Sequence, residues 1–264
     1  MIKFTTDNGQ SFEYPESLSD VTLKQYLEYL EFVESTKPKV LKDIDTANIK
    51  IAEAIELKDN KGLELARKEL DDATAVIDDV IQYQQIFPYY ARVVSFFSGL
   101  SVPLILGQVA DTLGMRVDHL TGLYVHTTKI FNQLPEVEYS NVLEVNGEVW
   151  YLPERFMSDS TVIEFAETAQ FQANLSKVEN GEWKSLAKMM CVLVRKKDEQ
   201  YSDKLLKREE LFLSWNLLDC WRVAFFLLRR IEVLQLSFQT YTNVQTLMQL
   251  RQELINSTMD SVGT

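Results

Sequence analysis

Short runs of alternating apolar and polar residues occur in the same order at two places in the chain. In each place two such runs flank an Asn-Gly pair, Asn8-Gly9 in the first copy and Asn146-Gly147 in the second. Asn-Gly tolerates the positive φ angles of a type I′ turn, so each place is predicted to form a β-hairpin. Pro15 and Pro153 then follow the second run, and proline ends a strand because it has no N–H to donate.

A helix is predicted after each hairpin. Thr22 and Thr161 each stand three residues before a Gln or Glu, which is the spacing of a capping box. The apolar residues that follow recur with the helical period and would face the hairpin. With one residue inserted, residues 2–32 align with residues 141–171. This alignment predicts an internal duplication, with convergence on a common hairpin-and-helix pattern as the alternative.

A further helical pattern, at about residues 39–86, is absent from the second copy. Its apolar residues alternate spacings of three and four, as in a coiled-coil seam, and DNKG at residues 59–62 interrupts them. The pattern predicts an inserted antiparallel αα-hairpin that turns at Asn60–Gly62. It is equally consistent with a projecting arm and with a helix pair that lies flat on the core. The predicted seam residues are Ile44, Ala47, Ile51, Ala54, Leu63, Ala66, Leu70, Ala73, Ile77 and Val80.

The predicted fold class is α+β, predominantly α-helical, with two hairpin-plus-helix repeat units. The first unit, residues 1–138, is interrupted by the αα-hairpin, and the second spans residues 139–264. Only 9 Gly and 6 Pro occur in 264 residues, which favours helix over a fold rich in strands and turns. Further helices are expected at 88–97, 103–113, 117–133, 183–195 and 209–238, and an amphipathic stretch opens the tail after residue 240.

Val93–Ala110 is the longest stretch without charge. Its length is compatible with a membrane span, but Gly99 and Pro103 favour core helices with a break between them. We therefore expect no contact with a membrane.

Charge and composition narrow the function classes. The chain has 27 Lys and Arg against 39 Asp and Glu, a net charge of −12, which disfavours nucleic-acid binding. The first ten residues lack the features of a secretory signal, which predicts a protein kept inside a cell. The two cysteines, Cys191 and Cys220, lie in apolar helical contexts and are expected to be buried, reduced thiols.

No catalytic, cofactor or metal motif occurs in the sequence, so we predict a protein that is not an enzyme and needs no cofactor. His119 and His126 can share one helix face, but nothing at zinc-ligand spacing joins them, and they are interpreted as surface or satisfied core residues. The segment 184–208 is locally basic and is interpreted as a solvated face or as a patch for an acidic protein surface, including another copy of this chain. The candidate partner-binding residues are Asp59, Asn60 and Lys61 at the hairpin tip, Arg195, Lys196 and Lys197 in the basic segment, and Leu247, Met248 and Leu254 in the tail.

Two stretches carry a resemblance to a known group of proteins. PESLSDVTLKQYLEYLEF, at residues 15–32, and YYARVVSFFSGLSVPLILGQVADTLGMRVDHLTGLYVHTTKIF, at residues 89–131, resemble the first sections of small assembly and tail-associated proteins of tailed bacteriophages. The resemblance implies a non-enzymatic structural or assembly protein in a tail or baseplate-like virion assembly. Its partners would be other phage structural proteins and further copies of itself, and it would be located in a virion assembled in the host cytoplasm.

Three alternatives to a virion component remain open. The chain could be a cytoplasmic tail assembly chaperone, an acidic inhibitor or adaptor, or an enzyme whose site is assembled only by folding. An enzyme predicts a cleft with converging polar groups, and an acidic inhibitor predicts carboxylates spaced along one exposed ridge.

Overall fold

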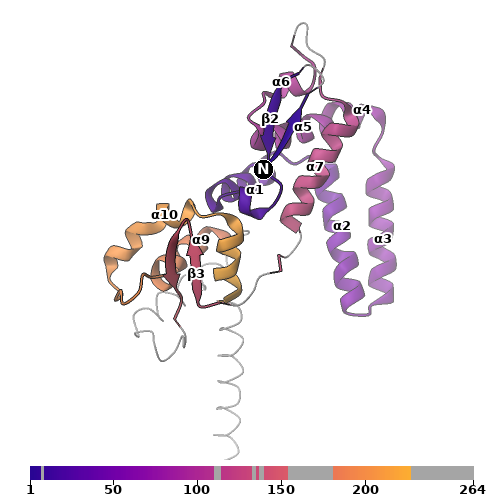
Figure 1. Cartoon of the computed structure of the whole chain (residues 1–264). Helices are drawn as coiled ribbons and strands as arrows, with labels where there is room; N and C mark the ends of the chain where they lie inside the picture. The colour runs from indigo at the N-terminus through magenta and orange to yellow at the C-terminus, as the bar shows by residue number, and fades with distance from the viewer. Residues whose placement is uncertain (7–8, 110–113, 133–134, 137–139, 154–180, 227–264) are drawn as a thin grey trace, which may run out of the picture. The chain divides into compact units, whose positions relative to one another are not determined.

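The computed structural model describes residues 1–6, 9–109, 114–132, 135–136, 140–153 and 181–226. These residues form a predominantly helical α+β protein with two small antiparallel sheets (Figure 1), which confirms the predicted fold class. The chain divides into two units. Unit 1 comprises Met1–Pro135 and Leu213–Leu218, and unit 2 comprises Glu136–Phe212 and Asp219–Thr264.

Unit 1 opens with the first predicted hairpin. Strands β1 (Ile2–Thr5) and β2 (Ser11–Tyr14) are antiparallel, with Phe4 opposite Phe12. The connection between them is longer than the predicted two-residue turn. Its first hydrogen bond runs from the Thr6 N–H to the Gln10 carbonyl at 2.8 Å, and Gly9 has a φ of 81°. These features are typical of a three-residue loop that ends in a bulge at glycine. Asn8 lies outside the described residues.

The first capping box is confirmed. Residues Leu18–Asp20 form a short helical turn, η1, and α1 (Leu23–Thr36) follows. The Thr22 hydroxyl accepts a hydrogen bond from the Gln25 N–H at 3.2 Å, and the Gln25 side chain accepts one from the Thr22 N–H at 3.0 Å. The reciprocal bonds satisfy donors that would otherwise be free at the start of the helix.

The helix predicted at Pro88 begins earlier than expected. Segments α4 (Asp79–Ile81), η2 (Gln82–Ile86) and α5 (Phe87–Ser98) run on without a break, and η2 is a π-helical turn. Pro88 has no N–H and its ring would clash with a carbonyl one α-helical turn earlier. A wider turn just before proline avoids that clash, so the helix continues through a residue that normally ends one.

The predicted break in the charge-free stretch is confirmed. Gly99 follows α5 with a φ of 70°, and α6 (Val102–Ile105) then begins with Pro103 in its first turn. The next helix is α7 (Val117–Asn132). Helices α5 and α7 pack together. Their buried residues form the core of unit 1 together with Phe12 and Tyr14 of the hairpin.

Unit 2 contains the second predicted hairpin. Strands β3 (Val142–Val145) and β4 (Glu148–Tyr151) are antiparallel and joined by Asn146-Gly147. The φ angles of these two residues are 55° and 76°, which confirms the type I′ turn. The helical segments α9 (Gly181–Leu193), η3 (Asp203–Arg208) and α10 (Glu209–Leu213) follow. Residues 217–226 are helical, so a bend at residues 214–216 divides the helix expected from residue 209.

Both predicted hairpins are therefore present. The helix of the second copy, including the Thr161 cap, falls in residues 154–180 and lies outside the described residues. The duplication of the whole hairpin-plus-helix unit stays a prediction.

Candidate functional site

The inserted αα-hairpin forms the predicted seam. Helices α2 (Lys39–Glu56) and α3 (Asn60–Ala75), together called the arm, pack chiefly on each other (Figure 1). Ala47, Ala54 and Ala66 are buried along the seam. The prediction is wrong for Val80, which is 56% exposed, because α3 ends before it and the chain changes direction.

The tip of the arm lies earlier than predicted. The helices are joined by residues 57–59, and α3 already begins at Asn60. The Asp59 carboxylate caps α3 by accepting the Lys61 N–H at 3.1 Å, and a Cβ at Gly62 would clash with the same carboxylate. Gly62 thus leaves room for the cap and is not part of the turn. Asp59, Asn60 and Lys61 are all exposed.

Exposed apolar side chains are concentrated on and next to the arm. Of the fourteen large hydrophobic residues that are exposed in the described part of the chain, seven lie between Ile49 and Tyr83. Ile49 and Ile55 are six residues apart, so they point about 120° apart around α2. The exposed apolar surface therefore extends around the arm. The seven residues are Ile49, Ile55, Leu57, Leu65, Val76, Val80 and Tyr83.

Two of the three candidate cations in the basic segment are engaged within unit 2. Lys196 Nζ lies 2.8 Å from a Glu148 carboxylate oxygen and 3.7 Å from the centroid of the Trp150 ring. The Arg195 guanidinium donates to the Val192 carbonyl at 3.0 Å, whereas Lys197 is exposed. These contacts hold the segment to its own hairpin, which reduces the positive charge available to a partner.

An ion pair strengthens this network. Arg208 forms two hydrogen bonds to the Glu199 carboxylate, and the Lys196 N–H donates to the same carboxylate at 3.1 Å. The bonds from Arg208 are the main reason that the pKa of Glu199 lies below its ordinary value. The charges of Lys196 and Arg208 are thus compensated within unit 2.

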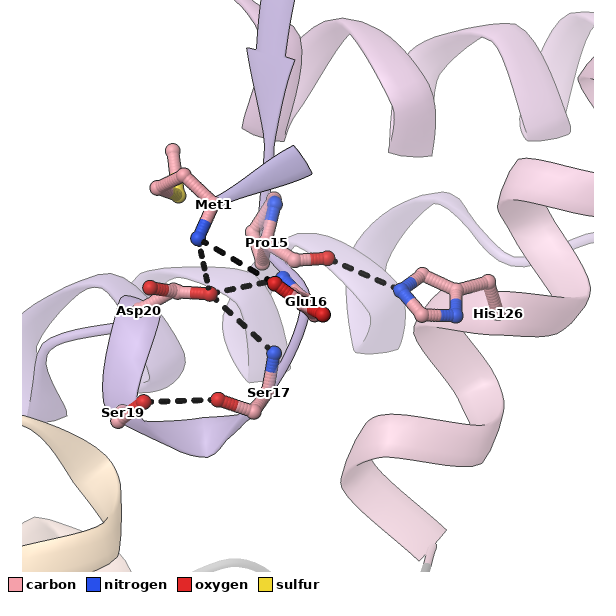
Figure 2. Close-up of polar contacts among 7 residues, drawn as sticks. All are labelled: Met1, Pro15, Glu16, Ser17, Ser19, Asp20 and His126. Atoms are coloured by element: carbon pink, nitrogen blue, oxygen red, sulfur yellow. Dashed lines mark hydrogen bonds and ion pairs between the residues drawn. The ribbon is translucent and has the colours of Figure 1, made fainter. Parts of the chain in front are cut away.

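The two histidines line one pocket of unit 1, which the sequence did not predict. The pocket has a volume of about 380 Å³ and lies between β1 and one face of α7. His126 donates from Nε2 to the Pro15 carbonyl at 3.0 Å (Figure 2), so it is a satisfied histidine as expected. His119 is exposed. The lining residues are Ile2, Phe4, Thr5, Thr6, Phe12, Met115, Asp118, His119, Gly122, Leu123 and His126.

The acidic group of this pocket is poorly suited to general base catalysis. The Asp118 carboxylate accepts hydrogen bonds from Arg116 Nε at 3.1 Å and from Nη2 at 2.8 Å. These bonds lower the pKa of Asp118 below its ordinary value, and a carboxylate with a low pKa is a weak base. The Asp118 carboxylate is therefore a weak base in this pocket.

Polar contacts fix the start of β1 beside the pocket. The Met1 amino group donates to Asp20 Oδ2 at 2.7 Å, and the Glu16 N–H donates to the same oxygen at 2.9 Å (Figure 2). Burial raises the pKa of Asp20, but these hydrogen bonds outweigh it and place the pKa below its ordinary value. The ionised carboxylate joins β1 to the η1 turn.

The remaining site predictions concern metal ligands, the two cysteines and the tail. No group of three or more His, Cys, Asp and Glu side chains in the described residues could hold a metal ion. Cys191 and Cys220 are free and buried, as predicted, and burial raises the pKa of Cys191 to about 11. Leu247, Met248 and Leu254 lie outside the described residues.

Two further findings concern membrane spans and similarity to known proteins. Within the described residues, no helix has the length and apolar character needed to cross a membrane. Searches of protein-family models, curated proteins and solved structures find no match to the chain.

Proposed function

We propose that the chain is a non-enzymatic structural or assembly protein that acts through protein–protein contacts. The resemblance described above suggests a tail or baseplate-like assembly of a tailed bacteriophage as its setting, with other phage structural proteins as partners. The observation that supports protein binding is the concentration of exposed apolar side chains on and next to the arm.

The arm has the physical properties of a contact element. Its two helices pack on each other along an alanine-rich seam. The outer faces of the helices are therefore not needed to hold the pair together. Scattered exposed apolar residues are ordinary on a protein surface, but here half of those described fall on and next to one element. Burial of such a side chain contributes roughly 1.5–3 kcal/mol. Because the exposed residues point in several directions, we expect the arm to be surrounded by partner surface.

The experiment shortens the arm without disturbing its base. Lys50 Nζ contacts Glu69 Oε2 at 2.6 Å, so these two residues lie opposite each other in the helix pair. Replacement of residues 48–71 by a short Gly/Ser linker removes the outer part of both helices and keeps Val40 and Leu41, which are buried. We expect cooperative melting of the remainder to be preserved, while recovery of partner proteins with the tagged chain is lost.

Point substitutions provide the matched test. L65S removes an exposed apolar side chain from α3, and K68S removes an exposed charged one from the same helix. Both should leave stability within about 0.5 kcal/mol, and only L65S should weaken partner recovery. Equal recovery with the shortened arm would show that the arm is not the contact. Recovery of a metabolic enzyme complex in place of virion proteins would refute the assembly role.

A further inference from the structure

We propose that the outer edge of β1, with the pocket beside it, binds an extended segment of a different protein as a third strand. The groove is defined by the eleven pocket residues named above and by the backbone of Lys3 and Thr5. It lies on other elements than the arm, so it stands or fails independently of the proposed function.

The backbone of β1 has free hydrogen-bonding groups along this edge. In an antiparallel pair, successive residues direct their N–H and C=O groups alternately toward and away from the partner strand. The Thr6 N–H bonds to Gln10 across the ladder, so Phe4 also faces β2 while Lys3 and Thr5 face outward. No backbone hydrogen bond to these two outward residues is found in the described part of the chain. A partner strand would satisfy them.

The space beside this edge is suited to side chains of the partner. Its volume of about 380 Å³ is within the range of about 300–1,000 Å³ that is typical of ligand pockets. The side chains of Phe4, Phe12 and Leu123 line it and offer an apolar surface. The polar residues Thr6, Asp118 and His119 also line it. An extended peptide that runs along β1 would place every second side chain in this space.

Gly122 indicates a close approach to α7. It lies in the middle of the helix, where glycine is less stabilising than alanine. A Cβ built on Gly122 would have no atom within 4 Å, so packing within the unit does not explain the glycine. It lines the groove. An approaching partner backbone or side chain would explain the missing side chain.

The positive charge of Lys3 indicates which charge the partner strand carries. The Lys3 side chain is 82% exposed, and its Nζ lies 3.8 Å from Glu13 Oε1 in an exposed ion pair, which contributes little and leaves Lys3 accessible to a second carboxylate. Lys3 lies on the face of the hairpin opposite the pocket, because neighbouring side chains of a strand alternate. Direct pairing of two β1 edges would bring two such lysines close together, which disfavours a second copy. A partner strand with an acidic residue beside Lys3 is favoured. We therefore infer an apolar–acidic–apolar segment whose two apolar side chains enter the pocket.

A displayed random-peptide library selected on the full chain tests this inference. The probe for measurement is the most enriched peptide, synthesised with a fluorescent label and titrated by anisotropy. We expect an apolar–acidic–apolar pattern and at least tenfold weaker binding to Gly122→Leu, which fills the groove. Ala52→Leu, a substitution at an exposed position of α2, is the control and should bind like the unmodified chain. Gly122→Ala should raise the melting temperature and still weaken binding, which separates loss of binding from loss of folding.

Hydrogen exchange identifies the binding mode. The amides of Lys3 and Thr5 should become protected at least tenfold when the peptide binds, whereas the amide of Phe4 already faces β2. Failure to enrich any peptide, equal binding by Gly122→Leu, or binding without protection of Lys3 and Thr5 would overturn the proposal. Self-association of the unmodified chain that Gly122→Leu abolishes would also overturn it, because the occupant would then be a second copy.

Discussion

The two hairpins have similar sequences but differ in how their edges are completed. In unit 2, the Tyr151 N–H donates to the Arg195 carbonyl at 2.8 Å, and the Arg195 N–H donates back at 3.0 Å. On the other edge, the Ser140 hydroxyl donates to the Val142 carbonyl at 2.7 Å and accepts from its N–H at 3.1 Å. One outward-facing residue on each strand of this hairpin, Val142 on β3 and Tyr151 on β4, therefore has partners for its backbone groups.

The first hairpin lacks comparable contacts along β1 in the described residues. Lys3 and Thr5 face outward without backbone partners, and a pocket lies beside them. The two hairpins therefore share a local sequence pattern but differ in their surroundings. Open strand edges promote unwanted association and are usually protected, so the unprotected edge is the better candidate for a binding surface.

The largest expected effect concerns Trp150, which aligns with Phe12 of the first hairpin. Trp150 is 2% exposed, contacts Phe212 with ring centroids 5.7 Å apart, and lies beneath Lys196. We expect Trp150→Ala to lower the free energy of unfolding of unit 2 by about 3–5 kcal/mol. Phe12→Ala should cost less, because Phe12 already borders a hollow. Urea unfolding followed by circular dichroism measures both.

Val149→Ala is the control for Trp150. Val149 is 44% exposed on the neighbouring position of β4, so its truncation should change stability by about 0.5 kcal/mol or less. A larger loss for Phe12→Ala than for Trp150→Ala would show that the first hairpin is the more tightly packed one and would reverse the comparison.

A smaller effect is expected at Tyr14, which aligns with Leu152. The Tyr14 hydroxyl lies 2.6 Å from Thr127 Oγ1, and the Thr127 hydroxyl donates to the Leu123 carbonyl at 2.9 Å, so Tyr14 is the donor to Thr127. Burial raises the pKa of Tyr14, which keeps it protonated. Tyr14→Phe should lower stability by about 1 kcal/mol.

A double-mutant cycle with Thr127→Val tests the cause of that loss. Loss of the shared hydrogen bond should make the double variant less destabilised than the sum of the single variants. Strict additivity would mean that the two hydroxyls do not interact, and that hairpin and α7 are held together by apolar packing alone.

Local features were predictable from the sequence, and features set by distant contacts were not. The Thr22 cap, the Asn146-Gly147 turn and the seam through Ala54 depend on residues close together in the chain. The continuous helix through Pro88 was missed because a π-helical turn before proline has no simple sequence signal.

The pocket was also not predictable from the sequence, because residues far apart in the chain form it. The spacing of His119 and His126 indicated a common face of α7, but not what lies opposite that face. Pro15 and His126 are 111 residues apart, and the pocket exists only because the tertiary fold brings β1 to α7. Likewise, the contact of Lys196 with Trp150 could not be read from the local charge of the basic segment.

The smallest expected effect is a pH dependence that distinguishes the polar clusters of the two units. The hydrogen bonds from Arg208 hold the pKa of Glu199 below its ordinary 4.5. Burial raises the pKa of Asp20, but the bonds that it accepts around the start of β1 place it below its ordinary 3.8. A carboxyl group whose pKa is lower in the folded state stabilises that state above the unfolded pKa, and this contribution is lost as pH falls through the folded pKa.

We therefore expect stability to decline below about pH 4.5 in unit 2 and below about pH 3.8 in unit 1. Glu199→Gln should flatten the first decline and Asp20→Asn the second, since neither replacement ionises. Lys204→Gln, which alters net charge at an exposed position outside both clusters, is the control. Thermal melting across this pH range measures the slopes. An unchanged slope in Glu199→Gln would mean that the ion pair with Arg208 contributes nothing to the stability of unit 2, and that the basic segment is held to its hairpin by the backbone contacts of Arg195 and by the contacts of Lys196 with Glu148 and Trp150.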